Sequence, residues 1–238
     1  MNIISPMRVF LAGVLLLSSA LAHAGTQLGA TRIVLAAPAS EASIPVKNLT
    51  SSDVMIQSWI EAGEDDTSDV PLAVTPALSR LGGGKQQMLR IFYQGQGLPT
   101  DRESVFWLAV QEIPQKAQEE NTLQIAVRQR IKLFYRPAGL SGTPDAAAAA
   151  LNWKLVERDG RAMLQVSNPS AYHVSLAGAS LRDGGRNYAV TTEMVMPRAT
   201  QVFPLKDTHA RPSANATVTY QVVNDYGGQT SLTGALKR

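Results

Sequence analysis

The sequence contains no cysteine among its 238 residues. Disulfide bonds, thiolate metal sites, iron–sulfur clusters and cysteine nucleophiles are therefore excluded together. Charge is also scarce: charged residues make up 17% of the chain, and the formal charge of +3 is too small to indicate a nucleic-acid-binding protein. Hydrophobic residues reach 45%, which is typical of a globular chain with a buried core. The length allows one large domain or two of ordinary size.

No apolar run is long enough to span a membrane, which takes about 20 residues. Residues 1–24 carry one charge, Arg8, followed by the apolar run Val9–Leu17 and then by Ala22-His23-Ala24. The small residues around His23 are typical of a cleavage site, so residues 1–24 are predicted to be a secretory signal peptide. Removal of Arg8 with this segment lowers the formal charge from +3 to +2. We expect a soluble exported protein whose stability rests on core packing alone.

Short alternating or apolar runs, separated by turn residues, dominate the chain from Gln27 to Tyr135. Such runs predict β-strands, and helix-length periodicity is hard to find. The predicted strands are residues 31–35, 43–48, 54–61, 72–75, 85–92, 104–112 and 123–134. Seven strands in about 110 residues is the number found in an immunoglobulin-like sandwich.

Arg136-Pro137-Ala138-Gly139 ends this block, because proline lacks the backbone donor that a β-ladder needs. Residues 141–144 are predicted to be an interdomain linker, and the alanines at 146–150 a short turn. The β pattern then resumes at residues 152–158, 161–168, 173–182, 186–191, 199–204 and 216–223. We therefore predict an all-β chain of two immunoglobulin-like β-sandwich domains, over residues 25–138 and 139–238.

The usual motifs of enzyme chemistry are absent from the sequence. There is no Gly-x-Ser-x-Gly elbow, and Gly82-Gly83-Gly84-Lys85 has the residue types of a phosphate loop without its spacing. His173 and His209 lack metal-ligand spacing, and each is expected to be a surface or half-buried strand residue. The acidic run at 64–69 is predicted to be a solvated loop rather than a calcium site. We expect no catalytic residue, no metal ion and no cofactor.

The stretch from Asn121 to Pro137 is the most informative part of the chain. Leu123, Ile125 and Val127 share one side of a predicted strand and alternate with polar residues. Taken alone, a strand with three core-facing residues explains this pattern. As the last strand of a sandwich, however, it is predicted to lie at a sheet edge, where unpaired backbone groups can bind another chain. The same edge leaves self-association of the free protein open.

Several separate motifs extend over nearly the whole chain behind the predicted signal peptide. They are Thr31-Arg32, Asp101-Arg102-Glu103-Ser104, Glu112-Ile113-Pro114, Leu123-Gln124-Ile125-Ala126, Ile131-Lys132-Leu133-Phe134-Tyr135-Arg136-Pro137 and Asn224-Asp225-Tyr226-Gly227-Gly228. In this order they resemble the periplasmic pilus assembly chaperones of the chaperone–usher pathway. The resemblance implies two immunoglobulin-like domains in an L shape, and a non-catalytic periplasmic chaperone that lends a strand to pilus (fimbrial) subunits and delivers them to an outer-membrane usher.

The resemblance also implies roles for single residues. Arg32 and Lys132 are expected to line the cleft between the domains and to bind the C-terminal carboxylate of the subunit. Lys132 is not on the same side of the strand as Leu123, Ile125 and Val127, so a bulge or a twist after Arg128 is one way for it to reach the cleft. The sequence leaves this question open.

Two further sets of residues follow from the resemblance. The donor residues that enter the subunit are expected to be Leu123, Ile125 and Val127. An interdomain ion network that sets the angle between the domains is expected from Glu103, Arg136 and Asp225.

An exported two-domain carbohydrate-binding or adhesive module is the alternative. Such a module needs an exposed aromatic platform. The three tryptophans Trp59, Trp107 and Trp153 lie in strand patterns where burial in the core is expected.

Overall fold

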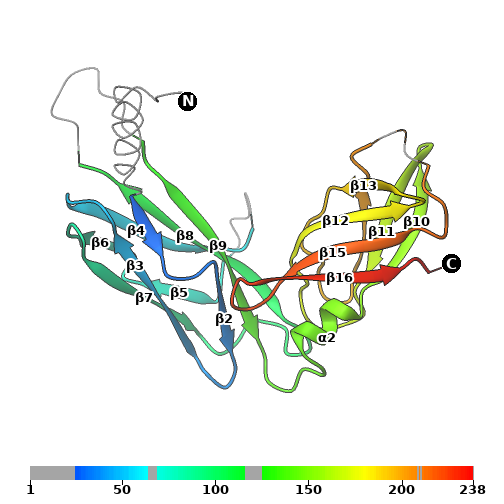
Figure 1. Ribbon diagram of the computed structural model, residues 1–238. Coiled ribbons are helices and arrows are strands. Elements are labelled where there is room, and N and C mark those ends of the chain that lie inside the picture. Colours follow the sequence, from blue (N-terminus) through cyan, green and yellow to red (C-terminus); the bar gives the residue numbers. More distant parts are fainter. Residues whose placement is uncertain (1–24, 64–68, 116–124, 208, 210, 238) are drawn as a thin grey trace, which may run out of the picture.

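The computed structural model describes residues 25–63, 69–115, 125–207, 209 and 211–237. In these ranges most of the regular backbone is β-strand, arranged as four sheets in two sandwiches (Figure 1). The prediction of an all-β chain with two immunoglobulin-like sandwiches is confirmed. The predicted signal peptide and most of the acidic run at 64–69 lie outside the described residues.

The N-terminal sandwich packs a four-stranded sheet against a five-stranded sheet. The first has the order β1 (Thr26–Leu28), β3 (Glu41–Asn48), β7 (Gln86–Tyr93) and β5 (Leu72–Thr75). The second has the order β2 (Arg32–Ala36), β9 (Arg128–Arg136), β8 (Ser104–Ile113), β4 (Val54–Glu61) and β6 (Leu78–Leu81). Alternate residues of the two sheets, such as Leu89 and Leu133, are fully buried between them. The short strands β1 and β6 were not predicted; the three residues of β1 are too few to show alternation.

The C-terminal sandwich packs a three-stranded sheet against a four-stranded sheet. The first has the order β10 (Asn152–Arg158), β11 (Arg161–Ser167) and β14 (Thr200–Pro204). The second has the order β13 (Arg186–Val190), β12 (Leu176–Asp183), β15 (Thr217–Val223) and β16 (Gln229–Ala235). Trp153 and Tyr220 pack in its core with their ring centroids 5.0 Å apart. The strand β16 was not predicted, because most of its side chains are polar and face solvent.

A short helix, α2 (Pro144–Ala149), connects the sandwiches. The turn predicted at 146–150 is therefore wrong. Thr143 caps the helix, since its Oγ1 accepts the Ala146 N–H at 3.2 Å, and Pro144 occupies the first turn, where its missing N–H leaves no bond unmade. Two of the alanines are buried in the second core, which fixes the helix further. No helix among the described residues is long and apolar enough to cross a membrane.

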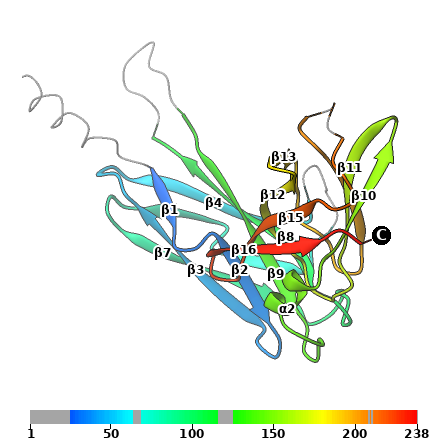
Figure 2. The same cartoon turned by 45° about the vertical axis from the view of Figure 1, so that its right-hand side comes forward.

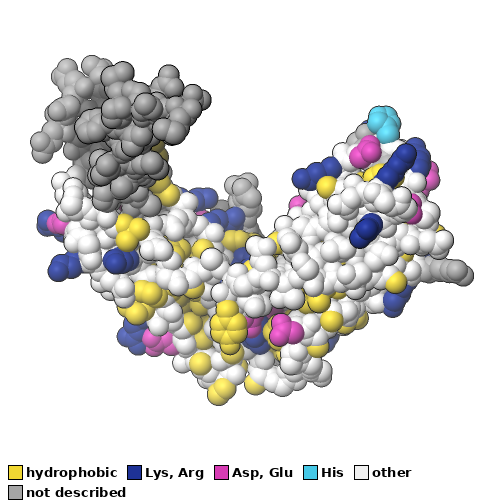
Figure 3. All heavy atoms as spheres, viewed as in Figure 1, with side chains coloured by type: hydrophobic (Ala, Val, Ile, Leu, Met, Phe, Trp, Pro, Cys, Tyr) yellow, Lys and Arg dark blue, Asp and Glu magenta, His cyan; other side chains and the backbone are white. Residues whose placement is uncertain are grey.

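The two sandwiches meet at an angle, so that the molecule forms an open L (Figures 1 and 2). The loop between β15 and β16 contacts the first sandwich at the corner. Gly227 in this loop has a φ of +84°, and a Cβ there would lie 2.4 Å from Thr31 Oγ1, so glycine permits this close approach. Figure 3 shows that the surface is hollowed between the two sandwiches.

The strand β9 is covered along its whole length on one side and along half of its length on the other. It pairs with β8 from Arg128 to Tyr135, whereas β2 pairs with it in parallel only from Lys132 to Arg136. Among the described residues, 128–131 have no strand partner on the β2 side. The prediction of an edge strand is therefore correct for its first half and wrong for its second. The strand also begins at Arg128, later than the predicted 123–134.

Candidate functional site

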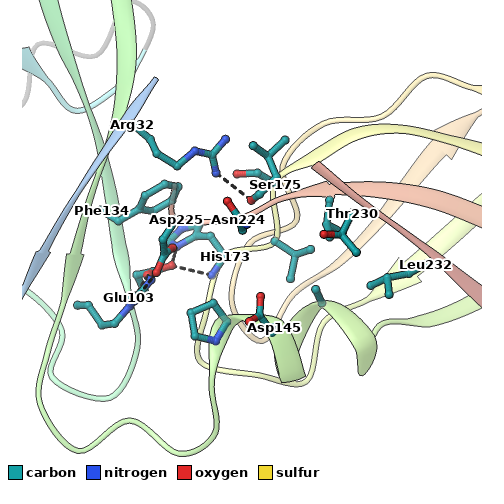
Figure 4. A pocket seen from close by; sticks show the side chains of 16 residues that line it. Arg32, Glu103, Phe134, Asp145, His173, Ser175, Asn224, Asp225, Thr230 and Leu232 are labelled. Carbon is teal, nitrogen blue, oxygen red and sulfur yellow. Dashed lines mark hydrogen bonds and ion pairs between the residues drawn. The ribbon is translucent and has the colours of Figure 1, made fainter. Parts of the chain in front are cut away.

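Two basic side chains lie together in the cleft between the sandwiches. Arg32 on β2 and Lys132 on β9 are direct partners in the parallel pairing, so both project from the same face of the sheet. Arg32 Nη1 donates a hydrogen bond to the Val223 carbonyl at 3.0 Å, and Lys132 Nζ lies 3.4 Å from Ser175 Oγ. Figure 4 shows the Arg32 side chain extended toward the second sandwich. The structure thus brings the two predicted cations together.

The charges of Arg32 and Lys132 are poorly neutralised. Neither forms an ion pair with a carboxylate in the part of the chain that the structure describes. Burial lowers the pKa of Lys132, and the Arg32 charge lowers it further; burial also lowers the pKa of Arg32, which the Asp225 charge partly raises again. Arg32 Nε is buried without a partner among the described residues. Two desolvated cations with unused donors favour an anion such as a carboxylate as ligand.

Lys132 reaches the cleft without a bulge. The pairing of β9 with β8 runs in a single register along the whole strand, so the backbone between Arg128 and Ile131 is regular. Leu133 points into the core of the first sandwich, and its neighbour Lys132 therefore points to the opposite face. That opposite face borders the cleft, so Lys132 reaches the cleft although it is not on the same side of the strand as Ile125 and Val127.

Arg136 forms an ion network across the corner of the molecule. Its guanidinium donates to Glu103 Oε1 at 2.8 and 3.0 Å and to the Asp225 carboxylate at 2.8 and 3.1 Å. Glu103 directly precedes β8, and Asp225 lies in the loop after β15, so the three side chains join both sandwiches. Burial lowers the pKa of Arg136, but the hydrogen bonds and charges of the two carboxylates outweigh burial and raise it overall.

Two further residues of this corner were not predicted. His173 was expected at the surface or half-buried in a strand, but it is buried and precedes β12. Its Nδ1 lies 3.0 Å from Glu103 Oε2, which also accepts the His173 backbone N–H at 2.9 Å. The Arg136 guanidinium carbon lies 5.3 Å from the centroid of the Tyr172 ring. No spacing pattern could reveal these contacts, because they join residues that are far apart in the chain.

Part of the predicted donor stretch is described. Ile125 and Val127 are exposed, at 69% and 46%, and Leu123 lies outside the described residues. The Glu112 N–H donates to the Val127 carbonyl at 2.9 Å, which continues the register of β8 and β9 as far as Val127. Val127 therefore lies on the same face of the strand as Leu133, beyond the end of the sandwich core. A row of exposed apolar side chains beside an open strand edge is typical of an interaction surface.

The prediction that all three tryptophans are buried in the core is correct for Trp153 alone. Trp59 and Trp107 are half-buried on the outer face of the five-stranded sheet. Arginine side chains of β9 lie over both rings, with distances from guanidinium carbon to ring centroid of 5.9 Å for Trp59 and 4.9 Å for Trp107. Rings covered in this way do not form the open platform that a carbohydrate-binding module needs.

A cavity of about 310 Å³ lies beside Arg32 at the base of the cleft. Both sandwiches line it, with Phe134 on one side and His173, Asp225 and Leu232 on the other (Figure 4). Nowhere in the described ranges do three or more His, Cys, Asp or Glu residues lie together as they would around a metal ion. Of the two arginines that line the cavity, Arg136 is paired with Glu103 and Asp225, whereas Arg32 has no carboxylate partner in the described part of the chain.

Two family descriptions match the chain in succession. "Pili and flagellar-assembly chaperone, PapD N-terminal domain" covers residues 25–141, and "Pili assembly chaperone PapD, C-terminal domain" covers residues 146–234. The chain therefore belongs to the family of pilus assembly chaperones. The resemblance seen in the sequence motifs is confirmed.

Relatives of the chain carry chaperone names. The "Chaperone protein FimB/FhaD" of Bordetella pertussis is 38% identical over 226 residues, which are 90% of this chain and 89% of that protein. The "Probable fimbrial chaperone YadV" of Escherichia coli is 33% identical over 84% of this chain and 85% of its own length.

Solved structures agree with this assignment. The YadV crystal structure has a TM-score of 0.79 at 32% identity and matches 90% of this chain and 100% of its own. The structure of the Salmonella enterica SafA pilin in complex with the SafB chaperone has a TM-score of 0.75 at 30% identity, covering 89% of this chain and 96% of that one.

The poorly neutralised charge of Lys132 should make the free protein less stable than a variant that lacks this charge. Because burial lowers the pKa of Lys132, the folded state holds the ammonium at a free-energy cost that the unfolded state lacks. This cost is fully present at pH 7 and fades as the pH rises through the lowered pKa toward 10.5. We expect Lys132→Met to raise the thermal midpoint at pH 7 by roughly 2–4 °C.

The difference between Lys132→Met and the unmodified protein should shrink in scans near pH 10. Lys47→Met, at an exposed position of β3, is the control and should leave the midpoint nearly unchanged. A midpoint for Lys132→Met at or below that of the unmodified protein would contradict the assignment of Lys132 as an uncompensated cation.

Proposed function

We propose that this chain is a periplasmic, non-catalytic chaperone that binds pilus subunits by strand addition and delivers them to the outer-membrane usher. The observation that carries the proposal is the uncovered first half of β9, with the exposed Ile125 and Val127 preceding it. The relative SafB, whose structure contains a pilin, supports the same assignment. The function requires neither a metal ion nor a cofactor.

The open edge supplies both the backbone hydrogen bonds and the apolar side chains of a missing strand. A pilus subunit that lacks its last strand exposes an apolar groove and unpaired backbone groups. The free N–H and C=O groups of β9 bond to that backbone, and Leu123, Ile125 and Val127 enter the groove. Burial of three such side chains contributes roughly 5–9 kcal/mol before the cost of ordering both partners is subtracted.

The two cations of the cleft anchor the end of the subunit chain. In this proposal the C-terminal carboxylate of the subunit accepts hydrogen bonds from Arg32 and Lys132, each worth about 1.5–3 kcal/mol. The carboxylate supplies the counter-charge that the free cleft lacks. Since one end of the subunit strand is thereby fixed, the anchor also sets which donor residue meets which pocket.

The corner network fixes the cleft between the two sandwiches. We assign an orienting role to Glu103, Arg136 and Asp225, since Arg136 links carboxylates from both sides of the corner. We place the boundary between the two domains shortly after the end of β9, between residues 138 and 139.

Removal of either anchor cation should strongly reduce the capture of subunits. Arg32→Ala or Lys132→Ala removes half of the carboxylate site, whereas the core of the sandwich contains neither side chain. We expect the amount of a co-expressed pilin that co-purifies with the chaperone to fall at least tenfold, in line with the loss of one charge-assisted hydrogen bond of about 1.5 kcal/mol or more. Arg182→Ala, at an exposed position of β12, is the control. Undiminished co-purification with both variants would refute the anchor.

A charge at the donor edge should block strand addition and spare the fold. Ile125 is exposed in the free protein, so Ile125→Asp should leave the unfolding transition unchanged, but it would place a carboxylate in the apolar groove of the subunit. Pilin co-expressed with this variant should aggregate or be degraded. Met88→Asp, at another exposed apolar position on β7, should retain normal capture. Soluble, chaperone-bound pilin with Ile125→Asp would rule out strand addition through this edge.

A further inference from the structure

A cluster of charged and aromatic side chains covers the outer face of the sheet beside the open half of β9. Glu61, at the end of β4, is its centre: its carboxylate accepts the Trp59 Nε1–H at 2.8 Å and a hydrogen bond from Arg130 Nε. Arg128 Nη1 lies 3.8 Å from the other side of the same carboxylate. The side chains of Glu61 and Arg130 are largely buried, at 16% and 21% exposed.

The two arginines reach Glu61 across the neighbouring strand. In the register of the sheet, Arg130 pairs with Ala109 of β8, and Ala109 pairs with Trp59 of β4. Alanine leaves room for the guanidinium of Arg130 to extend over β8, where it lies against the Trp107 ring. The interactions therefore connect β9 directly to β4, two strands away.

The backbone of these two arginines also forms the open edge of β9. Because the Glu112 N–H bonds to the Val127 carbonyl, residues 127, 129 and 131 direct their backbone groups toward β8. The backbone N–H and C=O of Arg128 and Arg130 consequently point to the other side, and β2 begins only opposite Lys132. Each residue with a free backbone edge is thus held in place by its own side chain.

We infer that Glu61, with Arg128, Arg130, Trp59 and Trp107, positions the open half of β9 so that it can be donated as a preformed strand. A strand that lacks a partner on one side otherwise frays, and every residue ordered on binding weakens the complex. The pairing with β2 restrains the second half of β9 at its edge. The cluster restrains the first half instead, through side-chain contacts on the face of the sheet. It leaves the backbone donors and acceptors of the edge free for a subunit.

The inference rests on the proposed function and names Glu61 as a positioning residue for strand donation. Glu61→Gln keeps an acceptor for Trp59 and removes the charge that holds the arginines. We expect the amide protons of Gln129 and Ile131, which bond to β8, to exchange about tenfold faster in the free protein, the effect of losing one charge-assisted hydrogen bond. The amide of Leu133, in the half covered by β2, should not change.

The binding of pilin should weaken in parallel. We expect the Kd for a pilin that the unmodified chaperone binds to rise about tenfold for Glu61→Gln, and Arg130→Gln to reproduce both effects from the other side of the pair. High salt should accelerate exchange at Gln129 and Ile131 in the unmodified protein and have little effect in Glu61→Gln, because screening weakens ion pairs that are partly exposed.

A matched control exists on the other sheet of the same sandwich. Glu41 pairs with Arg90 at 2.6 Å, and the Arg90 guanidinium lies 5.0 Å from the Phe92 ring centroid, so this trio has the same chemistry at a distance from β9. Glu41→Gln should change neither the exchange of the β9 amides nor the binding of pilin.

The inference is wrong if the Gln129 and Ile131 amides exchange at the same rate in Glu61→Gln as in Glu41→Gln and both variants bind pilin with the same affinity. This failure is distinct from that of the proposed function. If Ile125→Asp abolishes capture while Glu61→Gln behaves like the unmodified protein, strand donation is supported and the positioning role of Glu61 is wrong. If Ile125→Asp still captures pilin, the proposed function itself falls.

Discussion

The strand β9 has a full partner on one side and half a partner on the other, and the rest of the molecule follows from this asymmetry. A sheet edge with unpaired backbone groups invites association, which folded proteins ordinarily prevent. Here the open segment ends where β2 begins, at the register position that pairs Arg32 with Lys132. The free edge and Lys132 are thus consecutive parts of β9, with Arg32 beside Lys132 on β2 and exposed apolar residues before the edge. A bound chain would meet apolar contacts, backbone hydrogen bonds and charge in that order.

In the described part of the chain, neither Arg32 nor Lys132 forms an ion pair with a carboxylate, and the proposed function depends on this. Burial lowers the pKa of both Arg32 and Lys132, so the free protein holds two cations at a cost that an anionic ligand relieves. Arg136, a few residues further along the same strand, is in the opposite situation, since two carboxylates surround it. One strand therefore carries a cation without a carboxylate partner among the described residues, Lys132, and a cation held between two carboxylates, Arg136. The link holds the two sandwiches together at the corner beside the cleft.

Much of this arrangement could be predicted from the sequence, and the failures have physical causes. Strands with clear alternation, such as Val54–Glu61 and Asn152–Arg158, were predicted with the correct ends. The strand β16 was not, because its polar side chains carry no such signal, and the helix at Pro144–Ala149 depends on a cap and on tertiary packing. Motifs located Arg32, Lys132 and the corner network. They could not show that β2 covers only half of β9, or that Glu61 contacts Arg130, since both facts depend on pairing between distant segments.

The central claim is that a pilus subunit pairs with the open half of β9 through the backbone of Arg128 and Arg130. The most direct measurement is amide hydrogen exchange of these two residues by NMR, in the free chaperone and in its complex with a pilin. In the free protein both amides should exchange rapidly, and in the complex they should become strongly protected while Gln129 stays bonded to β8. If Arg128 and Arg130 exchange as rapidly in the complex as in the free protein, the subunit binds elsewhere and the account is wrong.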